Sequence, residues 1–72
     1  MISLDERLLD AHARGNTADL IDLYREAARA ALDDTARGFY LTHAHVFALE
    51  LGHPDTAKLR AELITMGREI PL

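Results

Sequence analysis

The spacing of its apolar residues constrains the fold of this chain more than any other feature of the sequence. Apolar side chains recur at every third or fourth position through four successive segments, which is the period of helices that bury one face. The alternation that is typical of a half-buried strand is absent over any strand-length stretch. With 72 residues, the chain suffices for one small domain. The sequence therefore predicts a single all-α domain of four helices over residues 1–72.

Residues that cap helices mark the ends of the first two helices. The segment from Ser3 to Glu6 has the spacing of a capping box, in which the serine hydroxyl accepts a hydrogen bond from the Glu6 amide. Gly15 can adopt the left-handed conformation that ends a helix. A second helix starts at Asn16 or Thr17 and runs to about residue 32. The apolar stripe of the first helix is Leu4, Leu8 and Ala11. The stripe of the second helix is Leu20, Tyr24, Ala27 and Ala31, and it is flanked by Ile21, Leu23, Ala28 and Leu32.

The third predicted helix is the most apolar of the four. It follows the acidic N-cap pair Asp33–Asp34 and reaches Leu51, before a glycine stop at Gly52. Apolar residues lie on most of its sides, which is typical of a central helix. We expect its core side to contain Tyr40, Ala44, Phe47, Ala48 and Leu51.

The fourth predicted helix begins with a proline. Pro54 suits the first helical position, where the missing N–H is not needed, and His53 before it is predicted to be an N-cap or turn residue. Gly67 and Pro71 end the helix. Its two adjoining apolar stripes are Ala57, Ala61 and Ile64, and Leu59, Leu63, Met66 and Ile70.

The two glycines that end the first and third helices relate two halves of the chain, because Gly15 and Gly52 are 37 residues apart. The matching positions are Leu4, Tyr24 and Ala27 around the first glycine, and Leu41, Ala44, Leu51, Ala57, Ala61 and Ile64 around the second. This pattern of residue sizes resembles the tetratricopeptide repeat. The resemblance implies two stacked antiparallel helical hairpins, and a four-helix bundle is the alternative. It also implies small residues where paired helices approach closely, namely Ala44, Ala48, Ala57 and Ala61.

A binding surface is a further implication of the resemblance. The first helix of each hairpin would line a shared concave face, which in this sequence carries Asp5, Leu9, His12, Phe39, Thr42, Val46 and Leu49. Helical geometry supports the last four independently, because positions 39, 42, 46 and 49 fall on one stripe. An exposed apolar strip of this kind usually marks an interface. The alternative interpretation is that Val46 and Leu49 belong to the core.

These observations predict a non-catalytic protein–protein interaction module. Two hairpins form a thin core, and arrays of this kind generally need three or more repeats to be stable. We therefore expect the strip to be covered by a second copy of the chain, in a homodimer, or by another protein. The alternatives are a purely structural oligomerisation unit and a small helical bundle that binds a metal or another ligand.

Charge and hydropathy argue against other classes of partner. A formal net charge of -4 opposes binding to nucleic acid. Arg25, Arg29 and Arg37 are interleaved with acidic residues, so we expect a mixed charged surface that does not attract anions. No segment approaches the ~20 consecutive apolar residues of a membrane helix, so no membrane partner is expected. The acidic start of the chain is unlike a signal peptide, which predicts a cytoplasmic protein.

Catalytic and metal-binding motifs are not recognisable in the sequence. There is no cysteine, and the carboxylates fall mainly at helix starts, where the helix dipole explains them. His43 and His45 are two positions apart on a helix, so their rings point about 200° apart and cannot hold one ion. We predict neither an enzyme nor a metal or cofactor site.

Overall fold

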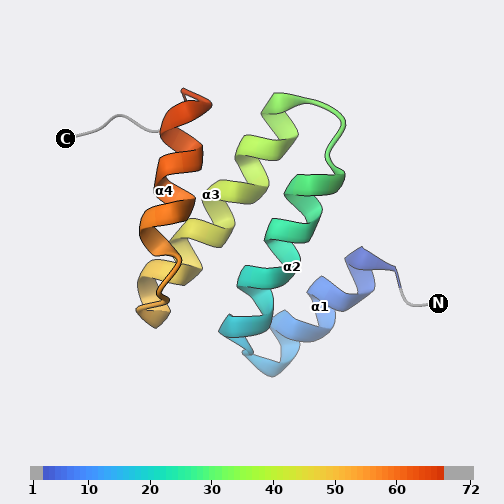
Figure 1. Cartoon of the computed structure of the whole chain (residues 1–72). Coiled ribbons are helices and arrows are strands. Elements are labelled where there is room, and N and C mark those ends of the chain that lie inside the picture. Colours follow the sequence, from blue (N-terminus) through green and yellow to red (C-terminus); the bar gives the residue numbers. More distant parts are fainter. Residues whose placement is uncertain (1–2, 68–72) are drawn as a thin grey trace.

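The computed structural model describes residues 3–67 and contains four α-helices joined by short turns (Figure 1). The helices are α1 (Leu4–Arg14), α2 (Thr17–Ala30), α3 (Asp34–Leu51) and α4 (Thr56–Thr65). No strand occurs in this range, so the predicted all-α fold of four helices is confirmed. The expected roles of Ile70 and Pro71 concern positions outside the described residues.

Side-chain caps begin three of the helices at the predicted places. Ser3, Asn16 and Asp33 each accept a hydrogen bond from the backbone N–H three residues later, at 3.2, 3.1 and 2.7 Å. The two predicted glycine stops are also confirmed, because Gly15 and Gly52 have φ angles of 64° and 69°. These left-handed conformations let the chain turn back sharply after α1 and α3.

The end of α2 is earlier than predicted. The helix stops at Ala30, and Ala31 is already extended, with φ -66° and ψ 139°. Asp33 must also be extended to cap α3, so the chain leaves the helical conformation before it reaches Leu32. Leu32 is fully exposed in this connection and does not join the core.

The start of α4 is also different from the prediction, because Pro54 precedes the helix and is not its first residue. His53 holds the turn before the helix. Its Nδ1 atom accepts a hydrogen bond from the Asp55 amide at 3.0 Å, and its carbonyl oxygen accepts one from the Thr56 hydroxyl at 2.7 Å. The proline is therefore part of a closed turn, and α4 begins at Thr56.

The helices form an open array one layer thick. In Figure 1, α2, α3 and α4 lie side by side with alternating direction, and α1 crosses obliquely against the start of α2. Each helix packs on its neighbours in the sequence, and no Cα atom of α1 lies within 8 Å of a Cα atom of α3 or α4. The principal extents are 38 × 29 × 14 Å. A closed four-helix bundle, the alternative architecture, would bring α1 against α4, and this array does not.

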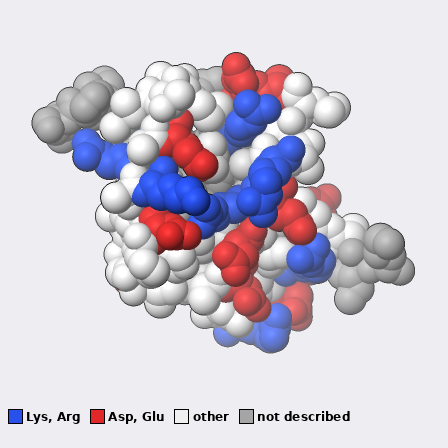
Figure 2. All heavy atoms as spheres, in the orientation of Figure 1, with Lys and Arg blue, Asp and Glu red and all other residues white. Residues whose placement is uncertain are grey.

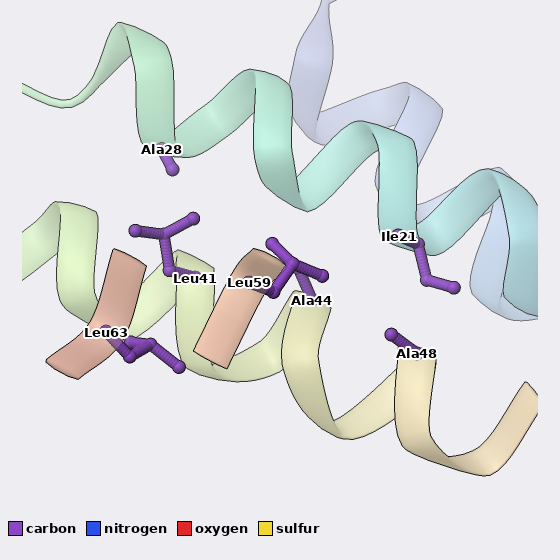
Figure 3. Packing of buried hydrophobic residues seen from close by; sticks show 7 residues of the cluster. All are labelled: Ile21, Ala28, Leu41, Ala44, Ala48, Leu59 and Leu63. Carbon is purple, nitrogen blue, oxygen red and sulfur yellow. The ribbon is translucent and has the colours of Figure 1, made fainter. Parts of the chain in front are cut away.

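The main core lies between α2 and α3, and α4 contributes side chains to it from one side. Its buried members are Ile21, Ala28, Leu41, Ala44, Ala48, Leu59 and Leu63 (Figure 3). Figure 3 shows Ala48 opposite Ile21 and Leu41 pointing toward Ala28, so large and small side chains alternate across the helix pair. A smaller cluster of Ala11, Leu20 and Leu23 joins α1 to α2.

Three residues that were predicted for the core or for close helix contacts are exposed. Ala57 and Ala61 lie at the surface because α4 buries Leu59 and Leu63, and residues two positions away point about 200° from them. Leu51 is 49% exposed, because burial on α3 ends with Ala48. The small-residue pattern therefore marks close packing on α3 but not on α4.

Replacing Ala48 with leucine tests this close packing. We expect Ala48→Leu to lower the free energy of unfolding by about 1–3 kcal/mol, because the larger side chain has no room against α2. The matched variant Ala57→Leu on exposed α4 should change it by less than about 0.5 kcal/mol. Urea denaturation measures both values, and equal losses would contradict the assigned packing.

A buried histidine on α3 is expected to reduce stability. His45 is 8% exposed, and its Nε2 atom has no hydrogen-bond partner among the described residues. A buried polar atom without a partner costs about 1–3 kcal/mol. We expect His45→Leu to raise the free energy of unfolding by about 1 kcal/mol or more. Urea denaturation would show this as a higher midpoint concentration of urea. A lower midpoint would show that the imidazole stabilises the fold.

Candidate interaction site

All seven residues of the predicted binding surface are exposed in the structure. The apolar ones are large, with exposed fractions of 70% for Leu9, 58% for Phe39, 45% for Val46 and 58% for Leu49. The polar ones are Asp5, His12 and Thr42. The alternative that Val46 and Leu49 are core residues is therefore wrong.

The structure brings only part of this predicted surface together. Phe39, Thr42, Val46 and Leu49 follow one side of α3, and we call these four residues the α3 strip. Asp5 and Leu9 lie on α1, which packs mainly on α2, with no Cα atom within 8 Å of α3. His12, in the last turn of α1, is the link between them, because its ring lies 5.9 Å from the ring of Phe47 on α3. The two helices therefore meet at one end only, and they do not line a shared face along their length.

An aromatic cluster borders the α3 strip. Its members are His12, Tyr24, Phe39, Tyr40, His43 and Phe47. Tyr24 is at its centre and stacks on His43 at 5.0 Å and on Phe47 at 5.9 Å between ring centroids. Phe39 contacts the His43 ring at 4.4 Å, which connects the cluster to the strip. The rings support one another, so the exposed Phe39 is held in place from beside and behind.

Hydrogen bonds occupy the polar groups of this surface. The Tyr24 hydroxyl lies 3.0 Å from Nε2 of His12. Burial raises the pKa of Tyr24, and the nearby Tyr40 adds to this, so the phenol is protonated at neutral pH and can donate. The Thr42 hydroxyl donates to the Gly38 carbonyl oxygen at 2.7 Å. The strip therefore offers mainly carbon atoms to solvent.

Tyr40 and Phe47 are partly buried against the core, as the sequence predicts, but the contact between His43 and Phe39 was not predicted. A signal was present, because Phe39, His43 and Phe47 are spaced by four residues and therefore share one side of α3. The position of Tyr24 in the same cluster depends on how α2 packs against α3, and spacing along one helix contains no information on it.

A groove lies on the other side of the array. Its volume is about 500 Å³, and its lining residues are Arg25, Ala28, Arg29, Arg37, Leu41, Lys58, Ala61, Glu62, Thr65 and Met66. Leu41 and Phe39 are two positions apart on α3, so the groove faces about 200° away from the strip. Figure 2 shows Lys and Arg side chains gathered across the middle of one face, with acidic side chains beside them. The surface is mixed, as expected, but the groove lining contains four cations and one acidic residue, because α2, α3 and α4 each contribute cations to it.

One arginine of the groove lining, Arg25, forms an ion pair with Asp55. Nη1 of Arg25 lies 2.8 Å from a carboxylate oxygen of Asp55, and the arginine side chain is only 17% exposed. The hydrogen bond from Arg25 lowers the pKa of Asp55 against a smaller opposing effect of desolvation, and the positive charges of Arg25 and Lys58 add to the lowering. The pair connects α2 to the N-terminus of α4 across α3.

No protein-family model, curated protein or solved structure matches this chain. Within residues 3–67, none of the helices has both the length and the apolar character that crossing a membrane requires. The same part of the chain contains no group of three or more His, Asp or Glu side chains placed to hold a metal ion.

Removing the Asp55 charge should make stability less sensitive to acid. The pKa of Asp55 is lower in the folded state than in the unfolded state. The ionised carboxylate therefore stabilises the fold fully at a pH above the ordinary carboxyl pKa of ~3.9, and this stabilisation is lost as the pH falls through the lowered pKa. We expect Asp55→Asn to lower the melting temperature at neutral pH, with the difference from the native chain shrinking toward zero once the pH is below the lowered pKa of Asp55. A difference that is constant with pH would contradict this account. Glu50→Gln, on an exposed residue of α3, is the control and should show no such trend.

Proposed function

We propose that this chain is a non-catalytic protein–protein interaction module, similar to a pair of tetratricopeptide repeats, that self-associates through the α3 strip. The observation that carries the proposal is the exposure of Phe39, Val46 and Leu49, which are between 45% and 58% accessible on one side of a single helix. Large apolar residues that lie singly on a surface need no explanation, but a continuous line of them usually marks an interface.

The dimensions of α3 suit a symmetric pairing. The helix has 18 residues and is therefore about 27 Å long, which is sufficient for two antiparallel copies to lie strip against strip. Most homodimers have a two-fold axis, so the same patch contacts itself. In such a pairing the ring of Phe39 would be a rigid anchor, because His43 and Tyr40 already hold it.

The thinness of the array favours this pairing as well. One dimension is only 14 Å, so the chain has little interior of its own. A second copy on the strip would give α3 apolar neighbours on both sides, and association stabilises a marginal fold by mass action. Both copies carry the same net charge of -4, so we expect added salt to strengthen the dimer by screening their repulsion.

Replacing Val46 with a charged residue tests self-association. At micromolar concentration, sedimentation equilibrium should give the native chain twice the mass of one copy and give Val46→Glu the mass of one copy. The variant should also melt at a lower temperature that no longer depends on protein concentration. The matched control is Leu32→Glu, because Leu32 is fully exposed but lies outside the strip and should leave the mass unchanged.

A native chain that is monomeric throughout the micromolar range, and whose melting is unchanged by Val46→Glu, would overturn self-association. Recovery of one specific different protein by the native chain, and its loss with Phe39→Ser, would then identify the strip as a surface for another partner. If Leu32→Glu also lost that protein, the strip would be neither the self-association surface nor the binding surface for the other protein.

A further inference from the structure

The groove between α2, α3 and α4 has no part in the proposed self-association. Its floor is apolar and comes from three helices, with Ala28 on α2, Leu41 on α3, and Ala61 and Met66 from the α4 segment. A volume of about 500 Å³ is within the range of small-molecule sites, roughly 300–1,000 Å³. The thioether of Met66 is flexible, so it can adapt to an apolar chain that lies against it.

Positive charge is concentrated around this floor. Four of the eight Lys and Arg residues of the chain line the groove, although the net charge of the protein is -4. Glu62 is the acidic residue in the lining. Arg25 and Arg37 are paired with Asp55 and Asp34, whereas Arg29 and Lys58 form no ion pair within residues 3–67. Among the described residues, the groove lining thus contains one cation from α2 and one from α4 that no carboxylate neutralises.

We infer that the groove binds a single-chain amphiphile with a carboxylate head group, such as a medium-chain fatty acid. The alkyl chain lies on the floor between α2 and α4, where it covers the exposed side chain of Ala61 and the partly buried side chain of Met66. The carboxylate pairs with Arg29, whose planar guanidinium can donate two parallel hydrogen bonds, and with Lys58. A docked protein segment would need about 800 Å² of surface on each partner, more than a groove of this size offers.

Decanoate, at concentrations below micelle formation, is the probe for the native chain in titration calorimetry. We expect saturable binding of one molecule per chain. The trimethylammonium amphiphile of the same chain length should bind at least about tenfold more weakly, because the groove cations repel it. Equal binding of the two amphiphiles would show nonspecific partition onto apolar surface and would overturn the inference.

Two matched tryptophan variants locate the ligand. Ala61 and Ala57 are both exposed on α4, but only Ala61 lines the groove. Ala61→Trp fills the floor and should weaken decanoate binding by about tenfold or more, whereas Ala57→Trp should leave it unchanged. If the two variants bind decanoate equally, or only Ala57→Trp loses it, the ligand lies elsewhere and the inference is wrong.

A charge reversal tests the head-group contact. Arg29 is exposed, so Arg29→Glu should fold normally and reduce decanoate affinity by about tenfold. Arg14→Glu, at the end of α1, is the control and should bind as the native chain does. Equal affinity of Arg29→Glu and the native chain would overturn the head-group assignment. The Val46→Glu variant should retain full binding, so failure of self-association and failure of this site are separate results.

Discussion

Close packing of α2 against α3 holds the rest of this structure in position. Ala44 and Ala48 are fully buried on α3, and their small size lets Ile21 of α2 fill the space between the two helices. α1 packs mainly on α2 and touches α3 at Phe47, and α4 packs on α3. The burial of a few aliphatic side chains at this one seam therefore determines where the outer helices lie, and the Arg25–Asp55 pair bridges it from one side.

The same seam creates two surfaces of different chemistry. On one side of α3, Tyr24 inserts its ring beside His43 and Phe47 and supports the exposed residues of the strip. On the other side, Leu41 forms the floor of a groove whose rim is basic. One helix thus contributes to an apolar surface, a buried core and a charged groove, which explains why apolar residues occur on most sides of it.

Features that depend on neighbouring residues could be predicted from the sequence, and features that depend on helix packing could not. The caps at Ser3 and Gly15 follow from local backbone chemistry, and the exposed strip follows from spacing along α3. The start of α4 was misplaced because the hydrogen bonds of His53 compete with the preference of proline for a first helical position. The basic groove was missed because its cations come from three helices, and each segment contains acids beside them.

The single-layer arrangement has a consequence for how the fold opens. Each outer helix has its main packing against one neighbour, α1 against α2 and α4 against α3, so α1 and α4 can separate in local steps while the central pair stays intact. Backbone amide protons of the outer helices would then exchange with solvent sooner than those of α2 and α3. A chain with few long-range contacts between distant segments is also expected to fold rapidly, from the central hairpin outward.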